Sequence, residues 1–258
     1  MFKVSNKILP EVEDLSPIVS SLNHKKDLFA VLLHNVLPEQ ECQDLIDRTE
    51  TMGYEAALVN VGGGRQVAMN DIRNSDRIIV DDPDYVERIY QRILQKLQYH
   101  HSNLELYQKL LDWRKNDKRQ KLAVGLNERM RILRYDPGCY FKPHSDGSYR
   151  RGYEAGLSRH GEMSEVTLLL YLNEGYEGGR TRFLSPHSSS TASHYDVVPQ
   201  TGSVLLFEHA CYHEGATLLQ GRKYILRTDV MYTTKGPGLE YSGGLNLDRG
   251  RGSPGYSD

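Results

Sequence analysis

The chain has 258 residues, of which 32 are basic and 34 acidic, so its formal net charge is -2. Because the charges nearly balance, the chain has no overall excess of positive charge that would favour binding to nucleic acid or to an anionic membrane. No apolar run approaches the roughly 20 residues that a membrane helix needs. No secretory signal is visible, and Cys42, Cys139 and Cys211 are too widely spaced for a disulfide framework. These features predict a cytoplasmic protein with one sizeable core.

The N-terminal part of the chain is expected to support the core. Residues 1–27 are polar and mixed, which predicts a loosely held arm. The fully apolar run Leu28–Leu33 favours a buried strand. A helix is predicted from Pro38, because proline is favoured at the first helical position, with Leu45 and Ile46 facing the core.

Two further helices are predicted before residue 121. Asp82 and Pro83 form a strong helix start, and the apolar residues of Val86–Leu97 then follow a 3.6-residue period. Residues 102–121 are expected to form the next helix, which ends in a basic segment around Trp113. A solvated face is favoured for that segment over a lid or a partner surface.

From residue 130 onward the pattern changes to short strands separated by glycine and proline turns. Such a series without intervening helices favours a β-sandwich or jelly roll, and the preceding helices would complete one α+β domain. The tail from Thr233 is rich in Gly, Ser and Pro, and is expected to be mobile. The predicted strands are Met130–Tyr135, Glu165–Leu172, Arg180–Leu184, Tyr195–Val198, Ser203–Phe207 and Tyr224–Tyr232.

A histidine followed two residues later by an acid occurs at His144, His160 and His194, so this pattern alone has little value. His144 and Asp146 are distinguished because they follow a predicted strand and a turn, and His213 lies just beyond another strand. Two histidines and one carboxylate on one face of a metal leave open positions. Non-haem Fe(II) oxygenases use this arrangement to admit co-substrate and O2.

The successive blocks RYDPGCYFKPHSDG, EVTLLLYLNEGYEGGRTRF, VPQTGSVLLFEHACYHEG and GRKYILRTDVMY resemble the prolyl-4-hydroxylase branch of the Fe(II)/2-oxoglutarate oxygenases. The resemblance implies a mainly β, α+β fold, a double-stranded β-helix with supporting N-terminal helices. It implies a single oxygenase domain over residues 28–232, with the jelly-roll core at about 128–232 and helical support at about 38–121. Residues 1–27 and 233–258 would flank this domain.

The resemblance also assigns roles to individual residues. It implies that His144, Asp146 and His213 are the iron ligands. Lys223, ten residues after His213, would pair with the distal carboxylate of 2-oxoglutarate. Tyr171 would hydrogen-bond the same carboxylate, and Tyr135 would line the co-substrate pocket.

Arg227 departs from the prolyl hydroxylase pattern, in which a small residue is common. It lies four residues after Lys223, so the two share one face of a strand. Arg227-Thr228-Asp229 is similar to the setting in which related branches anchor 2-oxoglutarate with an arginine. Lys223 is favoured as the anchor, although an arginine would give a better bidentate grip on a carboxylate.

Two other arginines alternate with Tyr135 along one strand. If Tyr135 faces the pocket, Arg131 and also Arg129 would face it, unless Arg129 lies at the exposed end of the strand and pairs with an acid. A buried arginine needs an anionic partner. The extra cations therefore suggest a substrate that bears a carboxylate or a similar anion.

The implied activity is that of a dioxygenase that uses Fe(II), 2-oxoglutarate and O2 to hydroxylate a C–H bond, with release of succinate and CO2. Its substrate would be a prolyl residue of a peptide or a small, possibly anionic, molecule, and the sequence also leaves desaturation, epimerisation and the oligomeric state open. The other hypotheses are a non-redox metal protein, including a zinc site of His209, Cys211 and His213, and a catalytically silent binding module of the same fold.

Overall fold

The computed structural model describes residues 11–60, 65–99, 103–113, 121–156, 158–186, 193–198 and 200–234. The predicted C-terminal tail from residue 235 and most of the basic segment after Trp113 lie outside these residues, whereas Thr233, where the tail was expected to begin, is the last residue of a strand. In the described part of the chain, no helix has the length and apolar character required to cross a membrane.

The expectation of a loose arm is wrong for its second half. Strand β1 (Val12–Asp14) pairs with β2 (Ala30–Leu33), and helix α1 (Ser16–Leu22) lies between them in sequence. Val19 of α1 is completely buried. The polar composition concealed this packing because only a few apolar residues carry it.

Helices α2 (Glu39–Met52) and α3 (Pro83–Tyr99) confirm two of the predicted helices. At the start of α3, the Asp82 carboxylate accepts a hydrogen bond of 2.9 Å from the Tyr85 backbone N–H, as expected of an N-cap. The helix predicted for residues 102–121 is shorter than expected. It is α4 (Leu104–Leu111), and the chain then enters strand β8 (Asp112–Trp113).

Two antiparallel sheets form the body of the molecule, and every predicted strand from residue 130 onward is present. The major sheet was predicted only in part, because β7 (Asp76–Asp81) and β9 (Lys121–Leu126) were not expected from the sequence. Its main path is β1, β2, β16 (Val204–Glu208), β12 (Met163–Tyr171), β19 (Lys223–Thr233), β10 (Arg129–Tyr135), β7 and β3 (Glu55–Ala56), with β9 paired to β19 and to β8.

The minor sheet faces the inner side of the major sheet and carries strands that the sequence analysis missed. It consists of β15 (His194–Val197), β14 (Thr181–Leu184), β17 (His213–Gly215), β11 (Tyr140–His144) and β6 (Arg73–Asn74). Two short pairs complete the described strands, β13 (Glu177–Gly178) with β18 (Leu218–Gln220), and β4 (Val59–Asn60) with β5 (Gln66–Val67).

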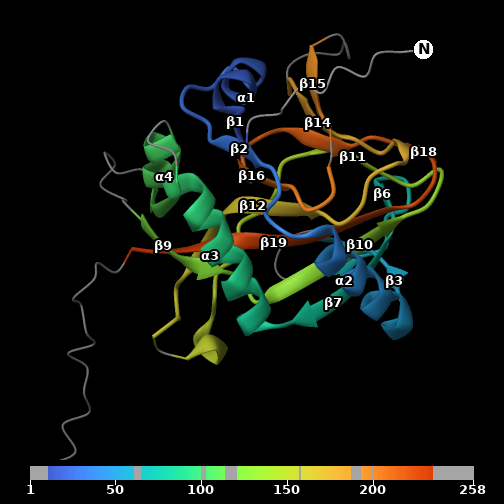
Figure 1. Cartoon of the computed structure of the whole chain (residues 1–258), viewed down its shortest axis with the longest axis horizontal. Helices are drawn as coiled ribbons and strands as arrows, with labels where there is room; N and C mark the ends of the chain where they lie inside the picture. Colours follow the sequence, from blue (N-terminus) through green and yellow to red (C-terminus); the bar gives the residue numbers. More distant parts are fainter. Residues whose placement is uncertain are drawn as a thin grey trace, which may run out of the picture.

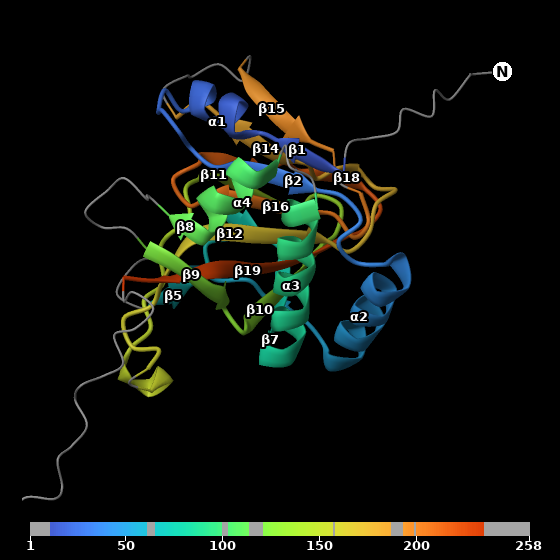
Figure 2. The same cartoon turned by 60° about the vertical axis from the view of Figure 1, so that its left-hand side comes forward.

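The major sheet separates two hydrophobic cores. Helix α3 crosses its outer face (Figures 1 and 2), where Ile89 and Ile93 pack in the same cluster as Leu226 of β19. The inner face packs toward the minor sheet in a second cluster, which contains Tyr135 and Ile225. Successive residues of β19 therefore alternate between the helices and the space between the sheets, and the candidate site occupies that space.

Candidate metal centre and co-substrate pocket

The pairing of β11 with β17 brings two of the three predicted ligands together. His144 ends β11 and lies directly opposite His213 at the start of β17. Directly opposed side chains in an antiparallel pair are close neighbours, and the two imidazole rings are 4.3 Å apart between centroids. Asp146 follows β11 in the next loop, where its backbone N–H donates to the carbonyl of His209.

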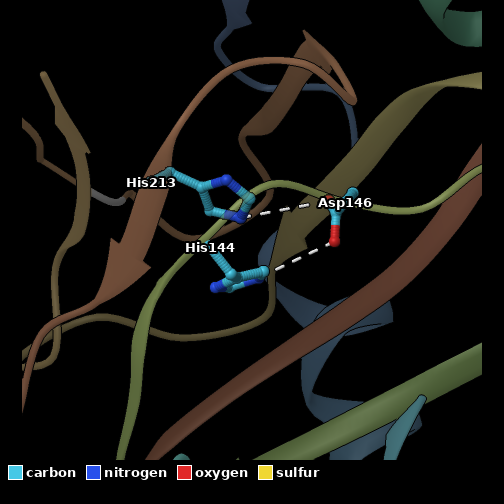
Figure 3. A group of neighbouring side chains, drawn as sticks. All are labelled: His144, Asp146 and His213. Atoms are coloured by element: carbon cyan, nitrogen blue, oxygen red, sulfur yellow. Dashed lines mark ion pairs between the residues drawn. The ribbon is translucent and has the colours of Figure 1, made fainter. Parts of the chain in front are cut away.

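Figure 3 shows the three side chains pointing toward one another. Asp146 Oδ1 is 3.7 Å from His144 Nε2, and Asp146 Oδ2 is 3.9 Å from His213 Nε2. One ligand atom from each residue lies within 4.8 Å of the other two. In the described residues, this is the only group of at least three His, Cys, Asp or Glu side chains with such a geometry.

The hydrogen bonds of the two histidines leave their Nε2 atoms, which face Asp146, available for a metal. His144 Nδ1 lies 2.8 Å from the carbonyl oxygen of Lys142, and His213 Nδ1 lies 3.0 Å from that of Cys211. A carbonyl oxygen only accepts, so each Nδ1 carries the proton and each Nε2 presents a lone pair. Burial lowers the pKa of His144 to about 3, and His213 contributes to this shift. The pKa of His213 is also lowered by burial, so both rings are neutral, as a metal ligand must be.

The carboxylate of Asp146 is fixed by two other strands. The Thr167 hydroxyl on β12 donates a hydrogen bond of 2.6 Å to Oδ2, and Arg227 Nη2 on β19 lies 2.9 Å from Oδ1. Burial by itself would raise the pKa of Asp146. The positive charge of Arg227 and the neighbouring histidines outweigh this effect, so that the pKa is lowered and the group is ionised. The donor set of two neutral imidazoles and one carboxylate fits Fe(II).

A cavity extends along the inner face from these ligands to Lys223, and Lys223 and Arg227 both line it. The Lys223 side chain is buried, donates to the carbonyl of Gly179, and lies 5.3 Å from the ring centre of Tyr135 and 5.8 Å from that of Tyr171. Among the described residues, no carboxylate forms an ion pair with it. Burial lowers its pKa to about 7.

The two tyrosines from the sequence analysis contact this end of the cavity in different ways. Tyr135 lines it directly, opposite Lys223 in the pairing of β10 with β19. Tyr171 is fully buried, and its hydroxyl donates to Thr181 Oγ1 at 2.9 Å. Thr181 lines the cavity, so Tyr171 orients a polar group that does so.

Arg227 and Lys223 share one face of β19, as expected, but their surroundings differ. Arg227 Nη2 is 2.9 Å from Asp146 Oδ1 and 3.5 Å from Asp229 Oδ1. Lys223 lies four residues away along the strand, about 13 Å at roughly 3.3 Å per residue. Arg227 is thus at the metal end of the cavity, and Lys223 is at the opposite end among the tyrosines.

The two additional predicted arginines of β10 lie in different environments. Arg131 is directly opposite Arg227, and its Nη1 is 3.8 Å from Asp229 Oδ2. Arg129 has an exposed side chain that donates two hydrogen bonds of 3.0 Å to the Asp81 carboxylate. The expectation that Arg129 faces the pocket is therefore wrong, because the strand extends past the inner cluster at this residue.

Sequence reasoning missed several residues around the site. In the sequence, Arg73 and Arg77 lie in the polar stretch IRNSDR, for which a solvated loop is favoured over the rim of a pocket. In the structure both side chains are buried, and Arg73 lines the cavity. The Arg73 guanidinium stacks on the Phe141 ring at 4.7 Å, and that ring stacks on His144 at 3.7 Å. Thr167 and Phe141 also escaped notice. The only signal was the arginine-rich sequence of the loop, which is no indication of burial.

The competing motifs take no part in the metal centre. His194 and Asp196 are 4.0 Å apart on β15, where Arg182 binds the Asp196 carboxylate. His160 stacks on Tyr153. Cys211 is fully buried against the backbone of Phe29, and it is not among the three residues of the metal group, which argues against the zinc hypothesis.

A jelly roll whose inner face has two histidines and a carboxylate at one end, and a buried lysine at the other, is the arrangement expected of a metal-dependent enzyme with an anionic co-substrate. Comparisons with known proteins agree with this class. Residues 130–228 match the family described as the 2OG-Fe(II) oxygenase superfamily. Over 242 residues the chain is 25% identical to Prolyl 4-hydroxylase 1 of Arabidopsis thaliana, covering 87% of this chain and 72% of that protein.

One solved structure supports the same fold, and a second shows a similarity only. A Trichoplax adhaerens prolyl hydroxylase, in complex with a hypoxia inducible factor peptide fragment, has a TM-score of 0.52 at 16% identity and covers 84% of this chain and 88% of its own. A prolyl-4-hydroxylase of Pseudomonas putida has a TM-score of 0.48 at 18% identity, with 84% and 97% covered.

Residues 130–228 carry the features of the 2OG-Fe(II) oxygenase superfamily, and the comparisons support its prolyl-4-hydroxylase-like branch. It is a 2-oxoglutarate-dependent dioxygenase, with Fe(II) as its cofactor and 2-oxoglutarate and O2 as co-substrates. The family and the mainly β fold expected from the sequence resemblance are confirmed.

Proposed function

We propose that this protein hydroxylates a C–H bond of its substrate and releases succinate and CO2, with His144, Asp146 and His213 as the iron ligands. The observation that carries the proposal is the convergence of their three ligand atoms within 4.8 Å. Packing of the strands alone gives no reason for two imidazole lone pairs to point at one carboxylate. Binding of a metal ion by all three groups explains this arrangement.

The protein residues have separate tasks around the cofactor. Bound Fe(II), together with 2-oxoglutarate and O2, supplies an oxidant able to attack an unactivated C–H bond. The carbonyls that accept from His144 and His213 keep each imidazole in the tautomer that binds a metal, and Thr167 holds the Asp146 carboxylate.

Lys223 is the proposed partner of the distal carboxylate of 2-oxoglutarate. It is a buried cation in the cavity without an ion-pair partner among the described residues, whereas Arg227 lies at the metal end of the cavity beside Asp146 and Asp229. A buried charge is stable only when an opposite charge or several hydrogen bonds compensate for it. The co-substrate would provide this compensation, with Tyr135 and the Tyr171–Thr181 pair around it.

Two substrate classes have support. The names of the similar proteins, prolyl hydroxylases from Arabidopsis thaliana and Trichoplax adhaerens, suggest a prolyl residue of a peptide. Arg227, which lines the cavity beside Asp146, and Arg131, which lies opposite it, favour a small anionic molecule instead.

The test is a screen for substrate-stimulated succinate formation from 2-oxoglutarate in the presence of Fe(II). Free amino acids, prolyl peptides and small acids should be compared, with His144→Ala as the blank. We expect one class to stimulate succinate release and to gain one oxygen atom, as detected by mass spectrometry. Binding of Zn(II) with no affinity for 2-oxoglutarate would contradict the proposal and favour a non-redox metal protein.

A further inference from the structure

The inner faces of β10 and β19 form a ladder of directly opposed side chains. Its first pair is Tyr135 with Lys223, the second is Leu133 with Ile225, and the third is Arg131 with Arg227. In the proposed function, the co-substrate lies between Lys223 and the metal ligands, over the second pair. The third pair lies beyond that stretch, beside Asp146.

Two guanidinium groups in directly opposed positions repel each other unless anions compensate for their charges. The only carboxylates that pair with them are Asp146 and Asp229, within the residues that the structure describes. Asp229 Oδ2 is 3.8 Å from Arg131 Nη1, which is too far for a hydrogen bond. Arg131 Nη1 is consequently buried without a hydrogen-bond partner.

Two more arginines add positive charge to this region. Arg73 lines the cavity, and its Nε donates to the Ser75 hydroxyl, a neutral group. Arg77 donates to the amide oxygen of Gln66, and its closest carboxylate is that of Glu55, at 3.7 Å and 70% exposed. The positive charge at this end of the cavity therefore exceeds what the neighbouring acids neutralise.

Metal binding would increase this excess. Asp146 is a proposed iron ligand, so a divalent cation would claim the carboxylate that now pairs with Arg227. The 2-oxoglutarate dianion would be engaged by the metal and by Lys223. The charge of the third pair would then be compensated only by Asp229. Both arginine side chains are 20% exposed. Arg227 lines the cavity, so a molecule in the cavity can reach it and the exposed part of Arg131 opposite it, whereas Arg131 Nη1 is buried.

We propose that Arg131 and Arg227 together bind a carboxylate of the substrate, so that the substrate is a small acid or amino acid whose carboxylate lies near the oxidised carbon. This inference rests on the proposed function. Guanidinium groups bind carboxylates through paired hydrogen bonds. The third pair therefore presents a carboxylate site next to the metal, separate from the lysine site for the co-substrate.

The test uses Mn(II) in place of Fe(II), saturating 2-oxoglutarate, and acetate as the probe. Paramagnetic Mn(II) broadens the NMR signals of protons that bind near it, so it reports proximity without turnover. We expect saturable broadening of the acetate methyl signal, and no such effect for acetamide, its neutral analogue. Broadening of the 2-oxoglutarate signals in the same sample tests the proposed function separately.

The decisive variant is Arg131→Gln. Loss of a charged hydrogen-bond partner should weaken acetate binding by roughly tenfold to hundredfold, whereas 2-oxoglutarate broadening should not change and would show that the variant is folded. Arg131→Lys retains the charge and should restore part of the binding. Arg129→Gln, on the same strand but paired with Asp81 at the surface, is the matched control and should bind acetate normally.

Three results would overturn the proposal: the acetate signal is not broadened, acetamide is broadened equally, or the Arg131→Gln variant broadens acetate as much as the unmodified protein does. If 2-oxoglutarate broadening were also absent, the proposed function itself would fail. In the succinate screen, the active compounds should carry a free carboxylate, and equal stimulation by their amides would also overturn the inference.

Discussion

The two faces of β19 have different roles, although the residues on them are adjacent in the sequence. On the outer face, Leu226 and Val230 pack with the residues of α3 in one continuous apolar cluster. On the inner face, Lys223 and Asp229 are buried and Arg227 is partly buried. Lys223 and Arg227 line the cavity, and Asp229 pairs with Arg227. Burial of apolar area on the outer face stabilises the fold, whereas burial of charged groups on the inner face destabilises it.

The comparison shows how one strand separates stability from chemistry. Because side chains alternate along a strand, each inner residue is held by two outer neighbours in a packed core. The helices thus anchor the strand from the side opposite to the site. Four predictions test this division, from the largest expected effect to the smallest.

Removal of one inner ligand should have the largest effect. His144→Ala should abolish stoichiometric binding of Fe(II) and all formation of succinate, because only one imidazole and one carboxylate would remain. Metal analysis after dialysis measures this loss. The matched control is His194→Ala, in a similar His-x-Asp sequence on β15, which should retain the metal. Equal metal loss in both variants would show that the site was assigned to the wrong histidine.

Truncation on the outer face should affect folding instead. Leu226→Ala removes a fully buried side chain and should lower the free energy of unfolding by about 2–5 kcal/mol, measured by denaturant titration. Affinity for 2-oxoglutarate should not change below the unfolding transition. Ile225→Ala, one residue away on the inner face, lines the cavity and should weaken co-substrate binding. If Leu226→Ala weakened it as much, the two faces would not be separable.

Loss of the hydroxyl that holds Asp146 should have an intermediate effect. Thr167→Val removes the 2.6 Å hydrogen bond to Asp146 Oδ2 and should lower metal affinity by roughly tenfold to hundredfold, measured by competition with a chelator. Thr228→Val is the control on the next strand, because the Thr228 hydroxyl donates to the Asn127 carbonyl away from the metal. A normal metal affinity in Thr167→Val would contradict a positioning role for Thr167.

The smallest effect concerns pH. Burial lowers the pKa of Lys223 to about 7, so its charge, and with it the attraction for a carboxylate, is fully present below that pH and is lost as the pH rises through it. Bound 2-oxoglutarate would raise this pKa again. Its affinity should therefore fall roughly tenfold between pH 6 and 8, as measured by calorimetry with Mn(II). Lys223→Arg should remove this dependence, since arginine stays charged; a persistent dependence would contradict the assignment.

Local patterns account for much of what sequence reasoning predicted correctly. The 3.6-residue period predicted α3, and apolar runs bounded by turns predicted β12, β16 and β19. The order of the strand, His144, Asp146, His213 and Lys223 was also sufficient to select one His-x-acid pattern among three. Neighbouring residues carry the information for the helix and the strands, whereas the order of the site residues is read over positions 144–223.

Burial of polar side chains was harder to predict. Arg73 and Arg77 were expected in a solvated loop, but β6 and β7 place both side chains inside the protein. Arg129 and Arg131 are two positions apart on β10, so strand alternation predicts that they share one face. Arg129 nevertheless binds Asp81 at the surface, whereas Arg131 lies opposite Arg227. No local pattern distinguishes them, because the difference depends on where the partner strands end.

By itself, the amino-acid sequence determined the family, the jelly-roll character and the identity of the candidate metal ligands, since these depend on residue types in a fixed order. Only the tertiary structure decided that Lys223 and Arg227 occupy opposite ends of one cavity and that Arg131 joins Arg227. Strand register sets those distances, and register arises from the packing of both faces of the sheet at once. That information is distributed over the whole core and is absent from any single segment.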